Sequence, residues 1–180
     1  MSTPRHIILI GFKNAGKSTI GKRLAQLLNR PFVDLDDKIE YLFQQKYKKA
    51  CRCREIMQIY GADFFRELET TALAETIAGP PHVIALGGGT PMRIENQRMI
   101  ASQCLIHITA EPKIIFKRIM KGRRPAFFPP GVDSRLTFNK IWEERDKVYH
   151  QLTSVRVQNS GKIEDTVQQL FEMHPWLGNV

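Results

Sequence analysis

A glycine-rich segment near the N-terminus has the residue types and spacing that bind phosphate groups. Residues 11–18 match the pattern G-x-x-x-x-G-K-[ST] at every fixed position. Glycines let backbone N–H groups turn inward around phosphates, Lys17 reaches the β and γ oxygens, and Ser18 offers a hard oxygen to Mg²⁺. An apolar run precedes the segment and an amphipathic pattern follows it, so a chance glycine-rich turn is the weaker interpretation. We therefore expect a nucleotide site here.

Two carboxylates, Asp34 and Asp36, follow the second apolar run. The carboxyl ends of neighbouring parallel strands meet at the ligand crevice of an open sheet, so we expect both beside the phosphate segment. One carboxylate suits Mg²⁺ through water, and the other suits an acceptor hydroxyl as a hydrogen-bond acceptor or base. The alternative is that Asp36 only caps the following helix.

Three further features bear on a second ligand. Gly87, Gly88 and Gly89 would expose backbone N–H groups to an anion, although an ordinary turn explains them equally well. Arg145 falls on an apolar helical stripe, where a buried guanidinium needs an anionic partner such as a substrate carboxylate. An internal ion pair is the alternative for Arg145, and an intrahelical pair is the alternative for Arg66.

The elements that must position these residues alternate between strand and helix. Apolar runs predict five strands at 6–10, 31–35, 82–86, 104–108 and 154–158, with helical periodicity between them. This alternation predicts an α/β fold with a parallel sheet covered on both faces. Within one domain of 180 residues, we expect a core (1–35, 79–121 and 135–180), a helical substrate subdomain (36–78) and a proline-rich lid (122–134). A plain surface loop is the alternative for the last segment.

Composition limits the partners and the compartment. The chain has 42% hydrophobic and 25% charged residues, which excludes collagen-like and wholly disordered classes. Its net charge of +9 predicts attraction to nucleic acid, an acidic membrane surface or small anions. Three cysteines are too few for a disulfide framework, so we expect the cytoplasm, and no Cys pair or His cluster has a zinc-like spacing. The apolar run at 7–10 is too short for a signal peptide or membrane span.

The ordered set of motifs resembles the shikimate kinase family, which has a P-loop, nucleoside-monophosphate-kinase-like fold. The resemblance covers nearly the whole chain, from about residue 7 to 161. It is carried by residues 11–19, then Phe32, Asp34, Asp36, Ile39 and Glu40, then Gly61, Phe65, Arg66 and Glu69, then Gly87, Gly88 and Gly89, then Arg124 and Pro125, and finally Arg145 and Tyr149.

The resemblance implies a site for ATP, Mg²⁺ and shikimate, and transfer of the γ-phosphate to the 3-hydroxyl of shikimate on the route to chorismate and aromatic amino acids. The implied catalytic residues are Lys17, Asp36 and Arg124. The implied nucleotide contacts are Gly11, Asn14, Ala15, Gly16, Lys17, Ser18, Thr19, Arg118 and Arg124. The implied substrate contacts are Asp36, Arg66, Gly87, Gly88, Gly89 and Arg145, and the implied metal ligands are Ser18 and Asp34. The family also implies a monomer.

One stretch departs from the family pattern. Residues 46–54 contain five basic side chains and no acidic one, in a segment longer than the family usually has. A solvated surface and a docking patch for an acidic partner are both open interpretations. The rival functions are a kinase for another small hydroxylated acid such as gluconate, a nucleotide kinase, and a nucleic-acid-binding P-loop NTPase, although no RNA-binding signature is present.

Overall fold

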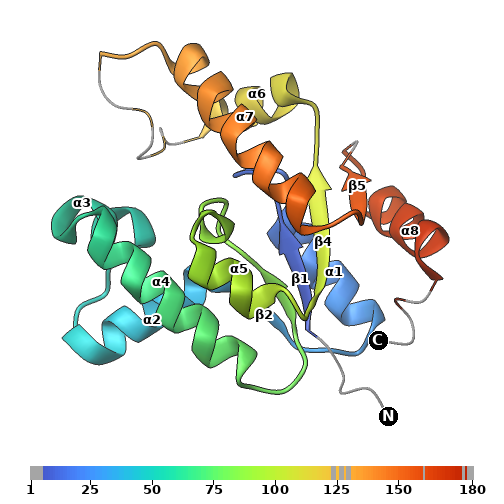
Figure 1. The fold of residues 1–180 in the computed structure, drawn as a ribbon, viewed down its shortest axis with the longest axis horizontal. Coiled ribbons are helices and arrows are strands. Elements are labelled where there is room, and N and C mark those ends of the chain that lie inside the picture. Colours follow the sequence, from blue (N-terminus) through green and yellow to red (C-terminus); the bar gives the residue numbers. More distant parts are fainter. Residues whose placement is uncertain are drawn as a thin grey trace.

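The computed structural model describes residues 6–122, 125, 128, 131–159, 161–175 and 177. Strands and helices alternate along the chain, as the ribbon shows (Figure 1). The strands are β1 (Ile7–Ile10), β2 (Phe32–Asp34), β3 (Val83–Ala85), β4 (Cys104–Thr109) and β5 (Arg156–Gln158). The helices are α1 (Lys17–Leu27), α2 (Leu35–Tyr47), α3 (Cys53–Tyr60), α4 (Ala62–Ile77), η1 (Thr90–Met92), α5 (Ile94–Ile100), α6 (Pro112–Lys121), α7 (Ser134–Leu152) and α8 (Ile163–Met173).

All five strands form one parallel sheet in the order β2-β3-β1-β4-β5. β1 lies at the centre and pairs with β3 on one side and β4 on the other. The connections after β1 and β3 therefore leave the sheet in opposite directions, which opens a crevice at the carboxyl ends of the central strands. The predicted α/β fold is confirmed, and each strand lies within its predicted range or extends it by one residue.

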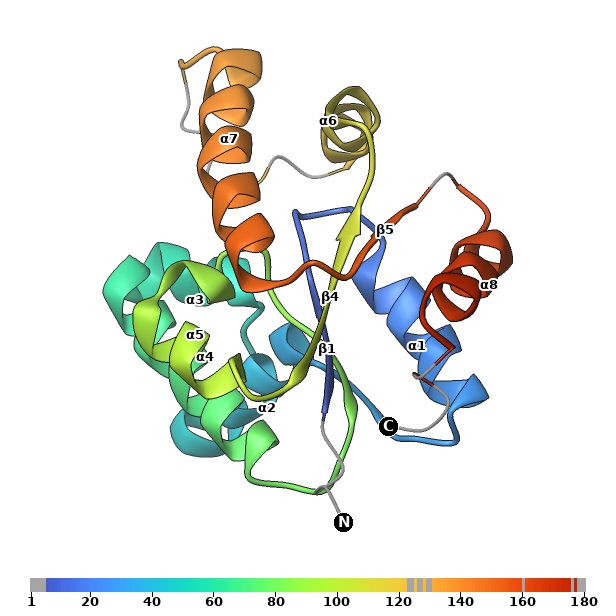
Figure 2. The same ribbon diagram turned by 45° about the vertical axis from the view of Figure 1, so that its right-hand side comes forward.

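Two hydrophobic cores cover the two faces of the sheet. Ile7 and Leu9 of β1 point into the core shared with α1, α6 and α8, while Ile8 and Ile10 point into the core shared with α2, α4 and α5. Figure 2 shows α1 and α8 on one side of the sheet and the α2 to α5 group on the other. Because both faces are buried, β1 is apolar at all four positions and does not alternate.

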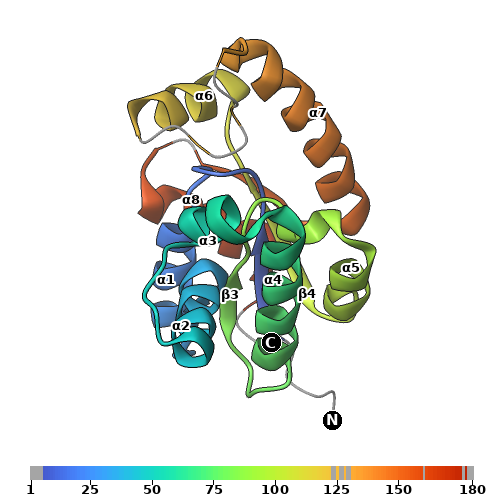
Figure 3. The same ribbon diagram turned by 90° about the vertical axis from the view of Figure 1, so that its left-hand side faces the viewer.

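Helices also stand above the carboxyl edge of the sheet. In Figure 3, α6 and α7 lie together at one end of the molecule, and α3 lies across from them. α2, α3 and α4 occupy the interval between β2 and β3 that the sequence identified as helical. Among the described residues, no helix has the length and apolarity needed to cross a membrane.

Gly21 lets α1 lie close to the sheet. A Cβ atom at this position would come within 2.6 Å of the Phe32 ring and 3.0 Å of the Leu9 side chain. Both neighbours are strand residues at the base of the phosphate-binding helix. A glycine inside a helix normally weakens it, so its presence here indicates a packing requirement.

We expect Gly21→Ala to destabilise the fold by about 1 to 3 kcal/mol, because overpacking outweighs the gain in helix propensity. Urea unfolding measures the change. Gly122→Ala is the matched control, since a Cβ there would meet nothing nearer than 3.7 Å. If Gly21→Ala were as stable as the wild type, the close packing of α1 would not need glycine.

Candidate functional site

The phosphate-binding segment turns sharply between β1 and α1. Gly11 and Gly16 both have positive φ angles, of 141° and 103°, which side chains rarely tolerate. The segment is fastened from outside by Asn159, whose Nδ2 donates to the carbonyl of Ala15 at 2.8 Å, and by Arg118, whose Nη1 donates to the carbonyl of Asn14 at 3.3 Å. No sequence pattern pointed to Asn159, because it follows the last strand in a segment without a motif.

The Lys17 ammonium lies inside this turn. Its Nζ donates to the carbonyl oxygens of Gly11 and Phe12, both at 2.9 Å, and the residue is only 8% exposed. Burial lowers the pKa of Lys17 to about 8, although the carboxylates of Asp36 and Asp34 oppose this change. The amine therefore titrates close to neutral pH. A phosphate that approaches it would stabilise its protonated form.

Asp34 joins the phosphate-binding helix to the next helix. Its Oδ2 accepts a hydrogen bond from Ser18 Oγ at 2.5 Å, and its Oδ1 accepts one from the backbone N–H of Asp36 at 3.1 Å. The N-cap of α2 is thus Asp34 and not Asp36. The alternative in which Asp36 serves only as a helix cap is therefore wrong, and its side chain is left for the cavity.

Asp36 lies between the phosphate segment and the glycine triplet. A Cβ on Gly87 would come within 3.1 Å of Asp36 Oδ1. Burial, followed by the charge of Asp34, raises the pKa of Asp36 to about 6, while Lys17 opposes the increase. The carboxylate is ionised at neutral pH but binds a proton far more readily than an ordinary aspartate, which suits a group that accepts a hydroxyl proton.

A buried carboxylate orients Arg66. Glu69 is 1% exposed, and its Oε2 accepts from Arg66 Nη1 at 2.5 Å while its Oε1 accepts from Thr90 Oγ1 at 2.8 Å. The intrahelical pair that we weighed as an alternative is therefore present. It leaves one edge of the guanidinium against Gly89, where a Cβ would lie 2.5 Å from Arg66 Nη2. Glycine at this position makes room for the arginine.

Arg145 projects from α7 toward the same cavity. Its guanidinium lies over the Phe12 ring, 5.4 Å from the centroid, and close to the backbone of Gly88. Burial, with nearby Arg66, lowers the pKa of Arg145. Tyr149, one turn further along α7, donates from its hydroxyl to the carbonyl of Gly88 at 2.5 Å. Two guanidinium groups brought together in a desolvated cleft favour binding of an anion between them.

These groups line one cavity of about 540 Å³. It contains ten of the predicted residues, namely Asn14, Lys17, Ser18, Asp34, Asp36, Arg66, Gly87, Gly88, Gly89 and Arg145. Gly11, Ala15, Gly16, Thr19 and Arg118 do not line it; Gly11, Ala15 and Arg118 instead shape or hold the phosphate segment. Arg124 lies outside the described residues.

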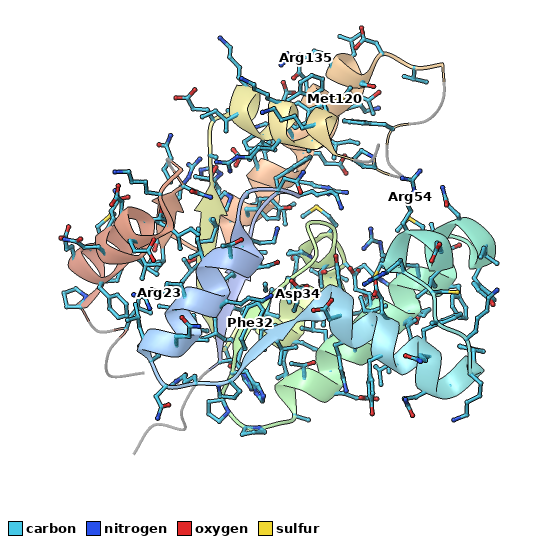
Figure 4. All side chains as sticks on the ribbon, turned by 180° about the vertical axis from the view of Figure 1, so that it is seen from behind. Arg23, Phe32, Asp34, Arg54, Met120 and Arg135 are labelled. Atoms are coloured by element: carbon cyan, nitrogen blue, oxygen red, sulfur yellow. The ribbon has the colours of Figure 1, made fainter. Side chains whose placement is uncertain are left out.

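The cavity also contains residues to which the sequence analysis assigned no role at the site, although Phe65, Glu69 and Pro125 belong to the family motifs. They are Lys13, Arg52, Cys53, Arg54, Met57, Phe65, Glu69, Leu86 and Pro125. In Figure 4, Arg54 extends from the start of α3 toward the side occupied by α6 and α7, while Asp34 lies near the centre of the molecule. The basic stretch at 46–54 thus places two arginines at the site. The positive charge of this stretch was the one feature of the sequence that could have indicated these arginines. Their position at the cavity depends on where the chain enters α3, which the sequence pattern does not predict.

The fold and the site together define a P-loop kinase. The parallel sheet, the buried lysine inside the glycine turn and the serine paired with an aspartate place a phosphate-binding segment beside a cavity whose cationic side chains suit an anion.

Comparison with known proteins identifies the family. The shikimate kinase family profile matches residues 13–174. A shikimate kinase from Rhodopirellula baltica is 33% identical over 171 residues, covering 91% of this chain and 87% of its own. One from Zymomonas mobilis is 37% identical over 148 residues, covering 81% and 80%. The structure of a shikimate kinase from Acinetobacter baumannii in complex with shikimate has a TM-score of 0.82, at 24% identity, covering 95% and 93%. The chain belongs to the shikimate kinase family.

Because Asp36 is costly to ionise in this cleft, we expect Asp36→Asn to stabilise the protein while removing the candidate base. A folded-state pKa above the ordinary value means that stability falls as the pH rises through about 4 to 6. The variant should therefore gain about 1 to 3 kcal/mol in free energy of unfolding at about pH 7.5 and lose this advantage near pH 4.

Urea unfolding at both pH values measures the effect. Asp37→Asn, on the exposed neighbouring residue, is the control and should change little. A variant at Asp36 no more stable than this control would show that the buried charge costs nothing.

Proposed function

We propose that the protein transfers the γ-phosphate of ATP to the 3-hydroxyl of shikimate, giving shikimate 3-phosphate. The observation that carries this proposal is one cavity holding Lys17 of the phosphate segment, the carboxylate of Asp36 and two arginines, Arg66 and Arg145. A hydroxylated carboxylic acid has one chemical group that suits the arginines and another that suits the aspartate. Its carboxylate suits the arginines, and its hydroxyl suits the aspartate.

Arg145 and Arg66 are the proposed carboxylate ligands. Both guanidinium planes border the glycine triplet, and Glu69 fixes the orientation of one of them. Arginine can bind a carboxylate through two parallel N–H···O bonds, which sets the ring of the substrate in one orientation. Gly88 and Gly89 leave the space that this approach requires.

Asp36 is the proposed base. A carboxylate with a pKa near 6 is ionised at neutral pH and accepts a proton from the attacking hydroxyl more readily than an unperturbed aspartate. Lys17 then neutralises charge on the transferring phosphoryl group, since kinases act mainly by positioning and electrostatic stabilisation.

Mg²⁺ is the proposed metal, held by Ser18 and Asp34. A hydroxyl and a carboxylate are hard oxygen donors, and the 2.5 Å hydrogen bond brings both to one point at the end of the phosphate segment. When bound, the metal would neutralise the phosphate oxygens. Arg118 donates to the carbonyl of Asn14, which supports its proposed role as a nucleotide contact.

The remaining expectations stay proposals. We assign 36–78 to substrate binding and 122–134 to a lid that excludes water, with Arg124 as its phosphate contact and the other segments as the core. All three cysteines are free, which supports a reducing compartment such as the cytoplasm. The family resemblance points to a monomer.

The rival substrates are gluconate, other small hydroxylated acids and nucleotides. A panel of these with MgATP, followed by ADP release, tests the proposal. We expect shikimate to stimulate ADP release well above background and above the other compounds. Absence of stimulation by saturating shikimate would overturn the assignment.

Replacing Arg145 by lysine separates the two substrates. We expect Arg145→Lys to raise the KM for shikimate at least about tenfold, because lysine cannot form the two parallel hydrogen bonds, and to leave the KM for ATP nearly unchanged. Arg23→Lys, on the exposed face of α1, is the matched control. Equal increases in both KM values would argue against a carboxylate role.

The pH dependence of kcat/KM for shikimate should report Asp36. Protonation below about pH 6 removes the base, so we expect kcat/KM to fall about tenfold per pH unit on that side. Nucleotide affinity measured over the same range separates this effect from weakened ATP binding. An acid limb near pH 4 would indicate that Asp36 is not perturbed in the working enzyme.

A further inference from the structure

A second cluster of ligating side chains lies outside the cavity, where α7 crosses β4. His107 comes from β4, and Asp146 and His150 come from adjacent turns of α7. One ligating atom from each lies within 4.8 Å of the others. The residues are far apart in the chain, so no spacing rule reveals them, and they belong to none of the motifs that mark the kinase site.

His107 is buried, and the hydrogen-bonding capacity of its imidazole ring is not satisfied. The residue is 2% exposed, and its Nδ1 has no hydrogen-bond partner. Its ring contacts those of Tyr149 and His150, with centroids 5.0 and 5.7 Å away. A buried polar atom without a partner is costly, and it requires an explanation such as an absent water or ion.

The two α7 residues complete the cluster with His107. His150 Nδ1 lies 3.4 Å from Asp146 Oδ2, and the other carboxylate oxygen, Asp146 Oδ1, is buried without a partner. Spacing of four residues places both side chains on one helix face. Two unsatisfied buried atoms, one from β4 and one from α7, therefore lie in the same cluster.

We propose that His107, Asp146 and His150 form a binding site for a divalent transition-metal ion, with Zn²⁺ the best match. Two imidazoles and one carboxylate are the donor types that Zn²⁺ takes, and water would supply the fourth ligand. Metal–ligand bonds of about 2.0 to 2.1 Å put ligands about 3.3 Å apart, so modest side-chain rotation closes the present spacing.

Nearby cations oppose the ion and limit how it can bind. Arg156 pairs with His107 in the sheet register and donates to Nε2 of His150. It is exposed, so its guanidinium can turn into solvent when the metal takes His150. Burial, followed by Arg156 and His150, then Lys17, lowers the pKa of His107 to about 3, which keeps its ring neutral and its lone pair available.

The site would connect directly to the kinase machinery. Asp146 adjoins Arg145, and Tyr149 between the two α7 ligands holds the carbonyl of Gly88. A metal bridging β4 and α7 would therefore hold the helix that carries the proposed carboxylate ligand. The expected result is a more stable protein, since the ion binds only the folded arrangement.

The test uses the nucleotide-free and Mg²⁺-free protein, titrated with Zn²⁺ by calorimetry and with Co²⁺ by visible absorption. We expect one equivalent to bind and the Tm to rise, and the cobalt spectrum to lack a sulfur charge-transfer band. His150→Gln and Asp146→Asn should each weaken Zn²⁺ binding at least about tenfold. His150 is exposed enough that its variant should fold, which circular dichroism checks.

His82→Gln is the matched control, because His82 also has a histidine neighbour, His6, but lies before β3 at the opposite end of the sheet. Binding lost in the α7 variants and retained in this control supports the site. Absence of binding to the wild type, equal binding by all variants, or a sulfur band that assigns the metal to the cysteines would each overturn it. None of these readouts depends on kinase activity.

Discussion

The buried charge of Lys17 is the constraint around which the rest of the site is arranged. Its ammonium is held by two backbone carbonyls inside the glycine turn, and the nearby carboxylates of Asp36 and Asp34 oppose the fall in its pKa that burial causes. Burial, followed by repulsion from Asp34, raises the pKa of Asp36. One desolvated cleft therefore lowers the pKa of a lysine and raises that of an aspartate, which suits the phosphate-binding and base roles proposed for them.

Local pattern was sufficient for much of this arrangement. The glycine turn and the apolar runs predicted the strands, the crevice and the carboxylates beside it, because periodicity and turn chemistry act over a few residues. The roles of other residues, such as Asn14 and Arg66, came from the family resemblance. Contacts between distant segments could not be predicted in the same way. Asn159 holds the phosphate segment, and Glu69 stood in a family motif with no predicted link to Thr90.

The excess of positive charge has a partial explanation in this structure. Arg52 and Arg54 of the basic stretch line the same cavity as Arg66 and Arg145, so part of the positive charge of the chain is concentrated at the candidate site. The remaining lysines of that stretch, at the end of α2, are exposed. A cleft crowded with cations raises the local concentration of anionic substrates and accelerates their capture.

Asp34 divides its two oxygens between the two halves of the site. One accepts from Ser18 at the start of the nucleotide helix, and the other caps the helix that carries Asp36. Any ligand that draws on the first oxygen alters the charge available to the second. With the proposed ligands in place, the affinities for the two substrates would be thermodynamically linked through a single carboxylate, and such a linkage acts equally in both directions.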